Sequence, residues 1–328
     1  MTASSLRPLG RTSLEVSPLG LGLAALGRPG YINLGHADDI GPDRTVETME
    51  RRAHEILDAA FDGGVRYFDA ARSYGRAEAF LASWLSRRGL EPRDVTVGSK
   101  WGYRYTAGWS VDAEHHEIKE HSLEMLQRQL GETRALLGEF LDLYQIHSAT
   151  LESGVLDNKE VLAELKGLAS EGVVIGLSTS GPRQIEIVRR ALDCAVDGVN
   201  PFSCVQATWN PLETSVGPAL EEAHGAGWGV LVKEALANGR LTDRGDAPAW
   251  FRKEARSLGV SVDALAIAVA MSRPWVDVVL SGAATVSQLH SNLSALDIAP
   301  PGSQLHSLPT RPEDPDDYWA RRAGLPWN

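Results

Sequence analysis

Short apolar segments rich in Val, Ile and Leu recur along the chain and alternate with longer segments of helical spacing. Between residues 50 and 62, for example, apolar residues fall at i, i+3, i+4, i+7 and i+8 from Ala53, which is typical of a helix with one buried face. Eight apolar runs have the length and composition of buried strands. They are Pro18–Leu23, Val65–Asp69, Asp94–Ser99, Leu141–Ile146, Val173–Leu177, Ser203–Gln206, Gly229–Val232 and Val276–Leu280.

Helical patterns fill the gaps between these runs, for example at Asp157–Ser170, Pro182–Ala195 and Ser261–Met271. Eight alternations of strand and helix predict an α/β fold, a closed parallel (β/α)8 TIM barrel, and no linker divides it. We therefore expect one barrel domain over residues 1–328.

Two further segments flank the predicted barrel. Residues 6–16 are expected to form a hairpin that closes the lower end of the barrel. The segment from Ile298 onward is rich in Pro and polar residues but carries Tyr318, Trp319 and Trp327. It is expected to be a loop held over an apolar surface at the barrel mouth, and a disordered tail is the alternative.

Composition narrows the class of partner. The net charge of −11 argues against nucleic acid, whose binding depends on clustered Lys and Arg. Cys194 and Cys204 are the only cysteines, which fits a reducing compartment. The first ten residues lack an apolar leader, and no apolar run reaches the length of a membrane span. We expect a cytoplasmic protein with a small-molecule substrate and no membrane partner; the pattern does not predict its oligomeric state.

Three successive predicted strands end in residues that can carry chemistry. Asp69 ends the second strand, Lys100 follows the third and His147 follows the fourth, while Tyr74 lies in the loop after Asp69. Because barrels place their active sites at the carboxyl ends of the strands, we expect these four side chains to meet there. Each residue alone has an ordinary structural explanation, as a turn cap, a paired lysine or a core histidine. Their order at consecutive strand ends favours catalysis.

The four residue types suit proton exchange with a carbonyl oxygen. A free tyrosine has a pKa of about 10, and a neighbouring ammonium group lowers it. Lys100 is expected to supply that charge, with Asp69 as its partner, and His147 is expected to orient the substrate oxygen. The set suits polarisation of a carbonyl while another agent delivers hydride, or the reverse reaction.

The run from Gly20 to Ala25 matches the G-x-G-x-x-A form of the dinucleotide fingerprint. A Rossmann fold requires a helix to begin there, and the sequence Gly27-Arg28-Pro29-Gly30 prevents one. This segment is better explained as a strand end that lines the barrel mouth.

With these motifs the chain resembles the aldo-keto reductase family over roughly residues 6 to 296. The resemblance assigns the catalytic tetrad to Asp69, Tyr74, Lys100 and His147. It also implies that Ser178, Thr179 and Gln206 hold the carboxamide of a nicotinamide cofactor, with Thr179 standing where the family usually has Asn. The remaining implied contact is Trp209, which would stack on the nicotinamide ring.

The run from Ser281 to Asn292 resembles the family's last strand and the following helix, which bind the adenosine end of the cofactor. The resemblance implies contacts from Gly282, Thr285, Gln288 and Asn292. Many members carry Arg at the position of Ala284, where it binds the 2′-phosphate. The resemblance implies NADP(H) as the cofactor, and NAD(H) is possible. Because Ala284 stands in place of this Arg, discrimination between the two cofactors is expected to be weak.

Two other groups of residues are candidates for a site. His115, His116 and His121 lie close in sequence but lack ligand spacing, so no metal is expected. Tyr31 and Trp101 lie in segments that would form the rim of the barrel, and they are candidates for the substrate pocket or for plain loop packing.

The sequence thus predicts an NAD(P)H-dependent aldo-keto reductase or alcohol dehydrogenase, acting on an aldehyde, a ketone or a sugar, with Tyr74 as the proton donor. A regulatory subunit that binds the cofactor with little turnover is the main alternative. A barrel lyase is a third possibility, and the implied carboxamide contacts Ser178 and Gln206 argue against it.

Overall fold

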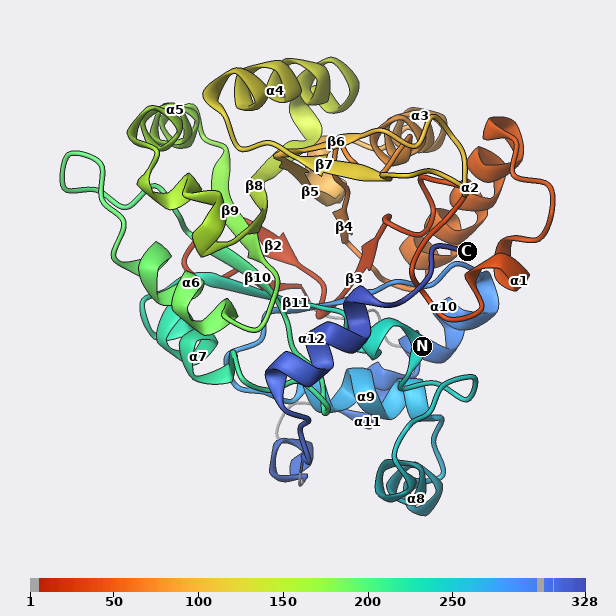
Figure 1. Cartoon of the computed structure of the whole chain (residues 1–328). Coiled ribbons are helices and arrows are strands. Elements are labelled where there is room, and N and C mark those ends of the chain that lie inside the picture. The colour runs from red at the N-terminus through yellow and green to blue at the C-terminus, as the bar shows by residue number, and fades with distance from the viewer. Residues whose placement is uncertain (1–5, 300–303, 309) are drawn as a thin grey trace.

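The computed structural model describes residues 6–299, 304–308 and 310–328. At its centre, eight parallel strands close into a barrel in the order β10-β11-β12-β3-β4-β5-β8-β9 (Figure 1). Their bounds are β3 (Leu19–Gly22), β4 (Tyr67–Asp69), β5 (Thr96–Trp101), β8 (Leu141–Ala149), β9 (Val174–Thr179), β10 (Cys204–Thr208), β11 (Gly229–Lys233) and β12 (Val278–Ser281). The predicted (β/α)8 barrel is confirmed, and each of the eight predicted strands overlaps one of these.

The helices are α1 (His36–Ile40), α2 (Val46–Asp62), α3 (Ala77–Arg88), α4 (Leu123–Leu137), α5 (Lys159–Ser170), α6 (Gln184–Leu192), α7 (Gly217–Gly225), α8 (Ala249–Leu258), α9 (Val262–Met271), α10 (Val286–Leu293), α11 (Ala295–Ile298) and α12 (Pro315–Ala323). Most of the helices cover the outside of the barrel, whereas α1 lies in the segment after β3 and α12 lies across the barrel mouth. Short 3-10 turns occur at Pro92–Asp94, Gly138–Phe140, Leu151–Ser153, Val155–Asp157, Ala237–Gly239 and Gln304–Ser307. The three helices predicted by range correspond to α5, α6 and α9.

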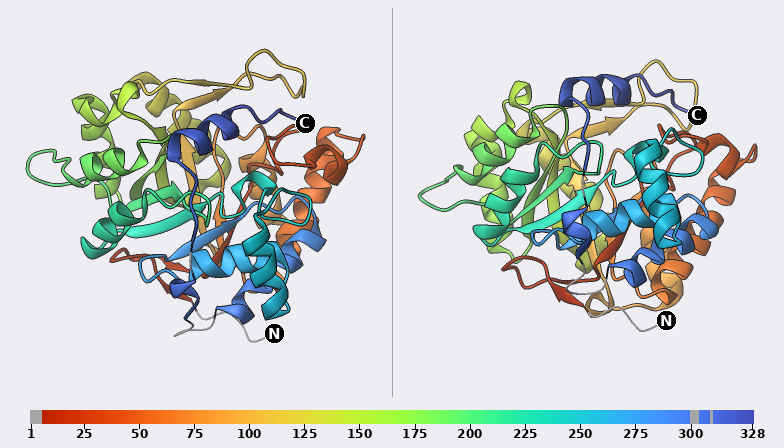
Figure 2. Two further views of the ribbon diagram at one scale, coloured as in Figure 1. Left: turned by 60° about the horizontal axis from the view of Figure 1, so that its bottom comes forward. Right: turned by 90° about the horizontal axis from the view of Figure 1, so that it is seen from below.

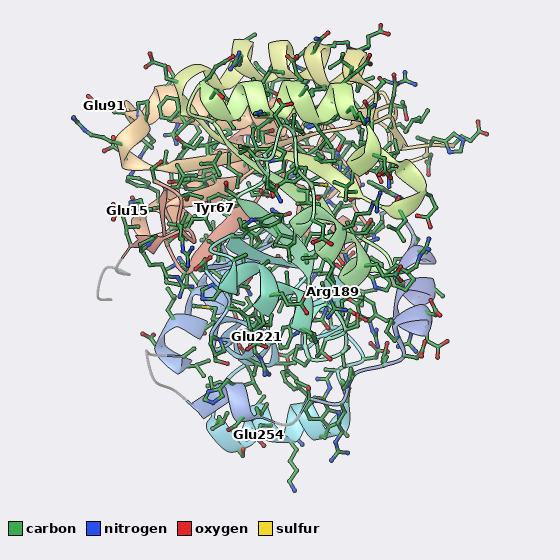
Figure 3. All side chains as sticks on the ribbon, turned by 90° about the vertical axis from the view of Figure 1, so that its left-hand side faces the viewer. Glu15, Tyr67, Glu91, Arg189, Glu221 and Glu254 are labelled. Atoms are coloured by element: carbon green, nitrogen blue, oxygen red, sulfur yellow. The ribbon has the colours of Figure 1, made fainter. Side chains whose placement is uncertain are left out.

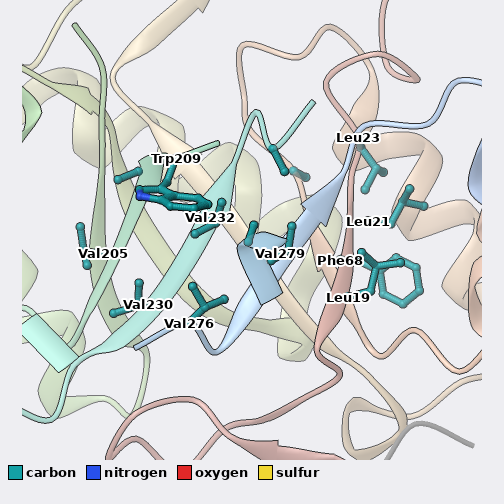
Figure 4. Packing of buried hydrophobic residues seen from close by; sticks show 14 of the residues in the cluster. Leu19, Leu21, Leu23, Phe68, Val205, Trp209, Val230, Val232, Val276 and Val279 are labelled. Carbon is teal, nitrogen blue, oxygen red and sulfur yellow. The ribbon is translucent and has the colours of Figure 1, made fainter. Parts of the chain in front are cut away.

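Alternation of side chains along the strands divides the buried residues into two clusters. Phe68, Val205 and Val279 belong to the cluster between barrel and helices (Figure 4). Their neighbours in the strands point inward, and the inner cluster consists of Tyr67, Leu143, Cys204, Leu231, Val278 and Leu280 with Leu9 and Val16. The last two residues belong to or adjoin the hairpin β1 (Arg7–Pro8) and β2 (Glu15–Val16), so the predicted hairpin packs against the barrel interior at its lower end (Figure 2).

The opposite end of the barrel is covered by the hairpin β6 (Tyr103–Tyr105) and β7 (Glu117–Lys119) and by α12, drawn in dark blue across the mouth (Figures 1 and 2). The expectation of a loop was wrong for residues 315–323, which form a helix. Asp314 caps its first turn and Pro315 occupies the first helical position. Tyr318 anchors the helix, since its hydroxyl accepts a hydrogen bond from Asn210 at 2.9 Å. Residues 300–303 and 309 lie outside the described part of this predicted tail.

Charged side chains such as Glu91 and Glu254 lie at the outer edge of the molecule, whereas Tyr67 lies within it (Figure 3). In the described part of the chain, no helix combines the length and the apolar character needed to cross a membrane.

Candidate active site

The four predicted catalytic side chains meet at the carboxyl ends of β4, β5 and β8. The Lys100 ammonium donates hydrogen bonds to the Asp69 carboxylate and, at 3.0 Å, to the carbonyl oxygen of Ala70. The Tyr74 hydroxyl lies 3.4 Å from Nε2 of His147, and the Lys100 Nζ lies 5.0 Å from the centre of the Tyr74 ring. All four are buried or half-buried. The structure therefore groups these residues as the sequence predicted.

Asp69 is the centre of a buried hydrogen-bond network inside the barrel. Besides Lys100, its carboxylate accepts hydrogen bonds from Tyr67 at 3.1 Å, Gln206 at 3.0 Å and Gln145 at 3.4 Å. A Cβ atom at Gly98 would lie 2.3 Å from the Tyr67 hydroxyl, so only glycine leaves room for this contact. The network fixes Asp69, and through it Lys100, in one orientation.

Burial raises the pKa of Tyr74 well above 10, the Asp69 carboxylate raises it further, and only Arg28 among its main influences lowers it. Lys100, which the sequence predicted would lower this pKa, is not among its main influences. The physical reason is that Asp69 neutralises the Lys100 ammonium at hydrogen-bond distance, so little positive field reaches the phenol. At neutral pH the phenol is consequently protonated, the form that a proton donor requires.

His147 is held as a neutral ring. Burial depresses its pKa well below 6.5, and the charges of Lys100, Lys233 and Arg28 depress it further. Ser73 Oγ lies 3.3 Å from Nδ1, and His121 Nε2 lies 3.0 Å from the carbonyl oxygen of His147. A neutral imidazole has one donor and one acceptor, so Nε2 can hydrogen-bond an oxygen placed beside the Tyr74 hydroxyl.

A cavity of about 530 Å³ extends from Tyr74 and His147 to the start of α10. This volume is in the range of small-molecule sites. The predicted strand end at the mouth contributes Gly22, Ala24 and Ala25 to its lining, and no helix begins there. Of the predicted cofactor and substrate residues, those that line it are Tyr31, Gln206, Gly282, Gln288 and Asn292.

Three of the predicted cofactor residues hold neighbouring loops instead of lining the cavity. Ser178 Oγ accepts a hydrogen bond from the backbone of Ser148 at 2.8 Å, and Thr179 donates to Gln184 at 3.1 Å. Thr285 caps α10 by accepting from the backbone of Gln288 at 3.2 Å. These contacts fix the ends of β8 and β9 and the starts of α6 and α10.

Neither tryptophan lines the cavity: the stacking predicted for Trp209 was wrong, and Trp101 shows the plain packing that was considered as its alternative. Trp209 is 3% exposed and packs edge-to-face on Trp275 with ring centres 5.8 Å apart (Figure 4). Because Gln206 points into the barrel, the residue three positions later points outward. Trp101 is fully buried and packs against His121, since it follows the inward-pointing Lys100.

Arg28 was missed in the sequence, where it was considered only as part of a helix-breaking segment. It is buried, donates to Glu117 at 2.7 Å, and its guanidinium lies over the rings of Tyr74 and Trp327 at 5.1 and 4.7 Å. It therefore connects Tyr74 to the β6–β7 hairpin and to the C-terminal segment. No periodicity marks such a residue, because its position depends on the packing of three loops.

A second charged group on the cavity wall was also missed. Lys233 ends β11, and Glu234 accepts hydrogen bonds from Arg322 of α12 at 2.9 and 3.0 Å. Burial lowers the pKa of Lys233 to about 8, while the pKa of Glu234 falls to about 2 because Arg322 and Lys233 outweigh the effect of its burial. A lysine that closes a strand was the signal that identified Lys100, and the same signal was present here.

A search of the described residues finds no group of His, Cys, Asp and Glu arranged to hold a metal ion. The histidines considered for a metal have other contacts. His116 stacks on Trp327 with ring centres 3.9 Å apart, and His121 contacts the His147 backbone.

Comparison with known proteins gives a consistent result. The aldo/keto reductase family model matches residues 18–307. The oxidoreductase YqkF of Bacillus subtilis is 26% identical over 88% of this chain and 90% of its own length, and the L-galactose dehydrogenase of Arabidopsis thaliana is 26% identical over 90% and 89%.

Solved structures agree with this match. A Pseudomonas aeruginosa protein assigned to the aldo-keto reductases superposes with a TM-score of 0.64 at 26% identity, covering 90% of this chain and 96% of its own. An aldo-keto reductase of Bacillus halodurans in its holo form has a TM-score of 0.68 over 97% and 96% of the two chains, at 19% identity, and it supports the fold alone.

Proposed function

The chain belongs to the aldo/keto reductase family and is a nicotinamide-dependent oxidoreductase, and we propose that Tyr74 is its proton donor in carbonyl reduction. The observation that carries this proposal is the pair formed by the Tyr74 hydroxyl and His147 Nε2, 3.4 Å apart at one wall of the cavity. A carbonyl oxygen placed beside both, within hydrogen-bond distance of each, would accept a hydrogen bond from each. The bound dinucleotide would supply or accept the hydride.

Residues of the protein transfer the proton and orient the reacting oxygen. Tyr74 gives its proton to the oxygen as negative charge develops on it, and neutral His147 holds that oxygen by a hydrogen bond from Nε2. Lys100 and Asp69 form a neutral pair behind the phenol and orient it. In the reverse direction Tyr74 accepts the proton from an alcohol, so oxidation is favoured by higher pH because burial raises the pKa of the phenol.

The cavity residues fit a nicotinamide dinucleotide. Gly282 and Ala284 line the groove before α10, and the lining continues along Gln288 and Asn292 of this helix. The helix begins there, and its N-terminal end favours anions such as the pyrophosphate. His36 supports the fit, because it lines the groove with both ring nitrogens buried and without a hydrogen-bond partner among the described residues. We propose that NADP(H) or NAD(H) binds along this groove.

The substrate end of the cavity has polar walls. Glu117, Tyr103 and Arg28 line it together with the ring of Trp327. Carboxylate and guanidinium groups can bind hydroxyl groups, and aromatic faces pack on the C–H side of a sugar ring. These walls favour a hydroxylated aldehyde or sugar over a purely apolar carbonyl compound, and the likeness to an L-galactose dehydrogenase is consistent with this.

The test is single-turnover oxidation of bound NADPH or NADH by an aldehyde or sugar, followed by absorbance. Wild-type protein should oxidise the cofactor. Tyr74→Phe should lose about 10²–10⁴ in rate while keeping its affinity for the cofactor, because the phenol acts on the proton. Tight binding without oxidation in the wild type would instead identify a regulatory subunit, and wild-type turnover by Tyr74→Phe would refute the role of Tyr74.

A further inference from the structure

An inserted segment that contains α1 lies against the groove that is proposed to hold the cofactor. Its Leu34 backbone donates to the carbonyl oxygen of Asn238 at 3.0 Å, and the Asn238 side chain contacts Asn33 at 3.4 Å. Asn33, Leu34 and Asn238 all line the cavity. The segment thus connects the loop after β3 with the loop after β11, and α1 lies beside the groove.

Asp39 of α1 links both sides of this groove. Its carboxylate accepts a hydrogen bond from Gln288 of α10 at 2.7 Å and forms an ion pair with Arg244 at 2.6 Å. The Gln288 side chain in turn accepts from the backbone of Ala284 at 2.9 Å. The Asp39 side chain is only 7% exposed, and it lines the cavity. A carboxylate therefore lies one side chain away from position 284.

Charge at this end of the groove is unfavourable for an additional phosphate. Asp39, Asp243 and Asp263 line the cavity here. Arg244 lines it too but is already neutralised by Asp39, and Arg252 lies 3.9 Å from Asp243. Arg240 does not help, because it is paired with Glu313 and Asp246. A 2′-phosphate would have to displace Asp39 from its ion pair with Arg244 and would leave the Asp39 carboxylate without its cation.

The hydroxyl groups of an unphosphorylated ribose have the opposite requirement. They are hydrogen-bond donors, and the Asp39 carboxylate is an acceptor that can receive them without loss of its pair with Arg244. On the basis of the proposed function, we propose that Asp39 selects NAD(H) over NADP(H) and that Arg244 is the group that would bind a 2′-phosphate once Asp39 is neutral. This reverses the weak NADP(H) preference expected from the sequence.

His36 of the same short helix supports a role of this segment in cofactor binding. It is 0% exposed, lines the cavity, and neither ring nitrogen has a hydrogen-bond partner among the described residues. Unsatisfied buried polar atoms are rare and are usually matched by a ligand or a water molecule. His36 is uncharged at neutral pH and does not distinguish the two cofactors by charge. His36 should therefore strengthen the binding of NADH and NADPH equally.

The experiment measures dissociation constants of NADH and NADPH by fluorescence titration at low and high salt. Wild-type protein should bind NADH more tightly by about tenfold or more, and Asp39→Asn should reduce this ratio by about tenfold or more, mostly by tighter NADPH binding. The gain should diminish as salt rises. In the double variant Asp39→Asn/Arg244→Met the gain should disappear. Asp38→Asn is the matched control, because this exposed neighbour changes the same charge outside the cavity lining.

Three outcomes overturn the proposal: a wild-type preference for NADPH, an equal change of both affinities in Asp39→Asn, or the same ratio change in Asp38→Asn. Thermal melting of each variant checks that it is folded. Arg244→Met gives an independent test, since it should weaken NADPH binding further and leave NADH binding nearly unchanged. If neither cofactor binds to the wild type, the proposed function itself fails, and this result is distinct from a failed selection by Asp39.

Discussion

The guanidinium of Arg28 lies 5.1 Å from the centre of the Tyr74 ring, and Arg28 is the positive group that most lowers the pKa of this buried phenol. The sequence pointed to Lys100 for this task. In the structure, Lys100 pairs with Asp69, whereas Arg28 lies over the Tyr74 ring. The residue that pairs with Asp69 and the residue that most lowers the pKa of the phenol are therefore different.

Arg28→Met should raise the pKa of Tyr74 and therefore move the alkaline rise of alcohol oxidation to higher pH. The rate at a fixed pH between 7 and 8 should fall about tenfold each time the midpoint of this rise moves up by about one pH unit. Arg28→Lys retains the charge and should move the profile less. The measurement is kcat/KM for oxidation between about pH 6 and pH 10. An unchanged profile in Arg28→Met would show that Arg28 only supports the loop.

Lys100→Met should abolish most turnover and also destabilise the fold, because Asp69 remains buried without its cation. Removing one partner of a buried pair costs about 3–5 kcal/mol in free energy of unfolding. Urea denaturation measures this loss. The double variant Lys100→Met/Asp69→Asn should recover part of the stability but not the activity, and a double variant as unstable as the single one would contradict the pairing.

Buried histidines make the fold sensitive to mild acid. Burial lowers the pKa values of His36 and His121 to about 4, so in the folded chain they stay neutral where the unfolded chain binds protons. Stability should therefore fall as pH drops below about 6.5, by about 2 kcal/mol per histidine between pH 7 and pH 5.

The pH effect can be isolated with His36→Gln, which should lose less stability than wild type over the same pH interval in urea denaturation. Burial raises the pKa of Asp142 to about 6, which acts in the opposite direction, but this contribution is common to both proteins and cancels in the difference. Equal losses in the two proteins would show that His36 titrates normally in the fold.

Ala284→Arg should tighten NADPH binding at low salt by about tenfold, because a guanidinium group forms bidentate contacts with a phosphate. The gain should fall as ionic strength rises, and NADH binding should change little. Ala284→Gln is the uncharged control in the same titration. A similar gain for both cofactors would place the 2′-position elsewhere in the groove.

The barrel was predictable because strands buried on both faces appear as continuous apolar runs, and the strands of this chain are short enough to be told from helices. The same pattern located Asp69, Lys100 and His147, since residues at strand ends share one rim. Asp314-Pro315 is a typical helix start and could have predicted helix α12. The segment was instead interpreted as a loop because it is rich in Pro and polar residues.

Other features depended on tertiary contacts or on the direction of side chains. Side chains alternate in direction along a strand, so counting from the inward-pointing Gln206 and Lys100 would have predicted that Trp209 and Trp101 point away from the cavity. Arg28 and Asp39 lie in an insertion without periodicity, and their partners Glu117 and Gln288 are distant in sequence. No local pattern could have paired them.

Asp69 joins four of the eight barrel strands, because its hydrogen-bond donors come from β4, β5, β8 and β10. A mutation at this position would therefore impair turnover and weaken the closure of the barrel at once. A substitution at Asp69 should therefore require a simultaneous change in its donors, so we expect adaptation to new substrates to proceed through the rim segments.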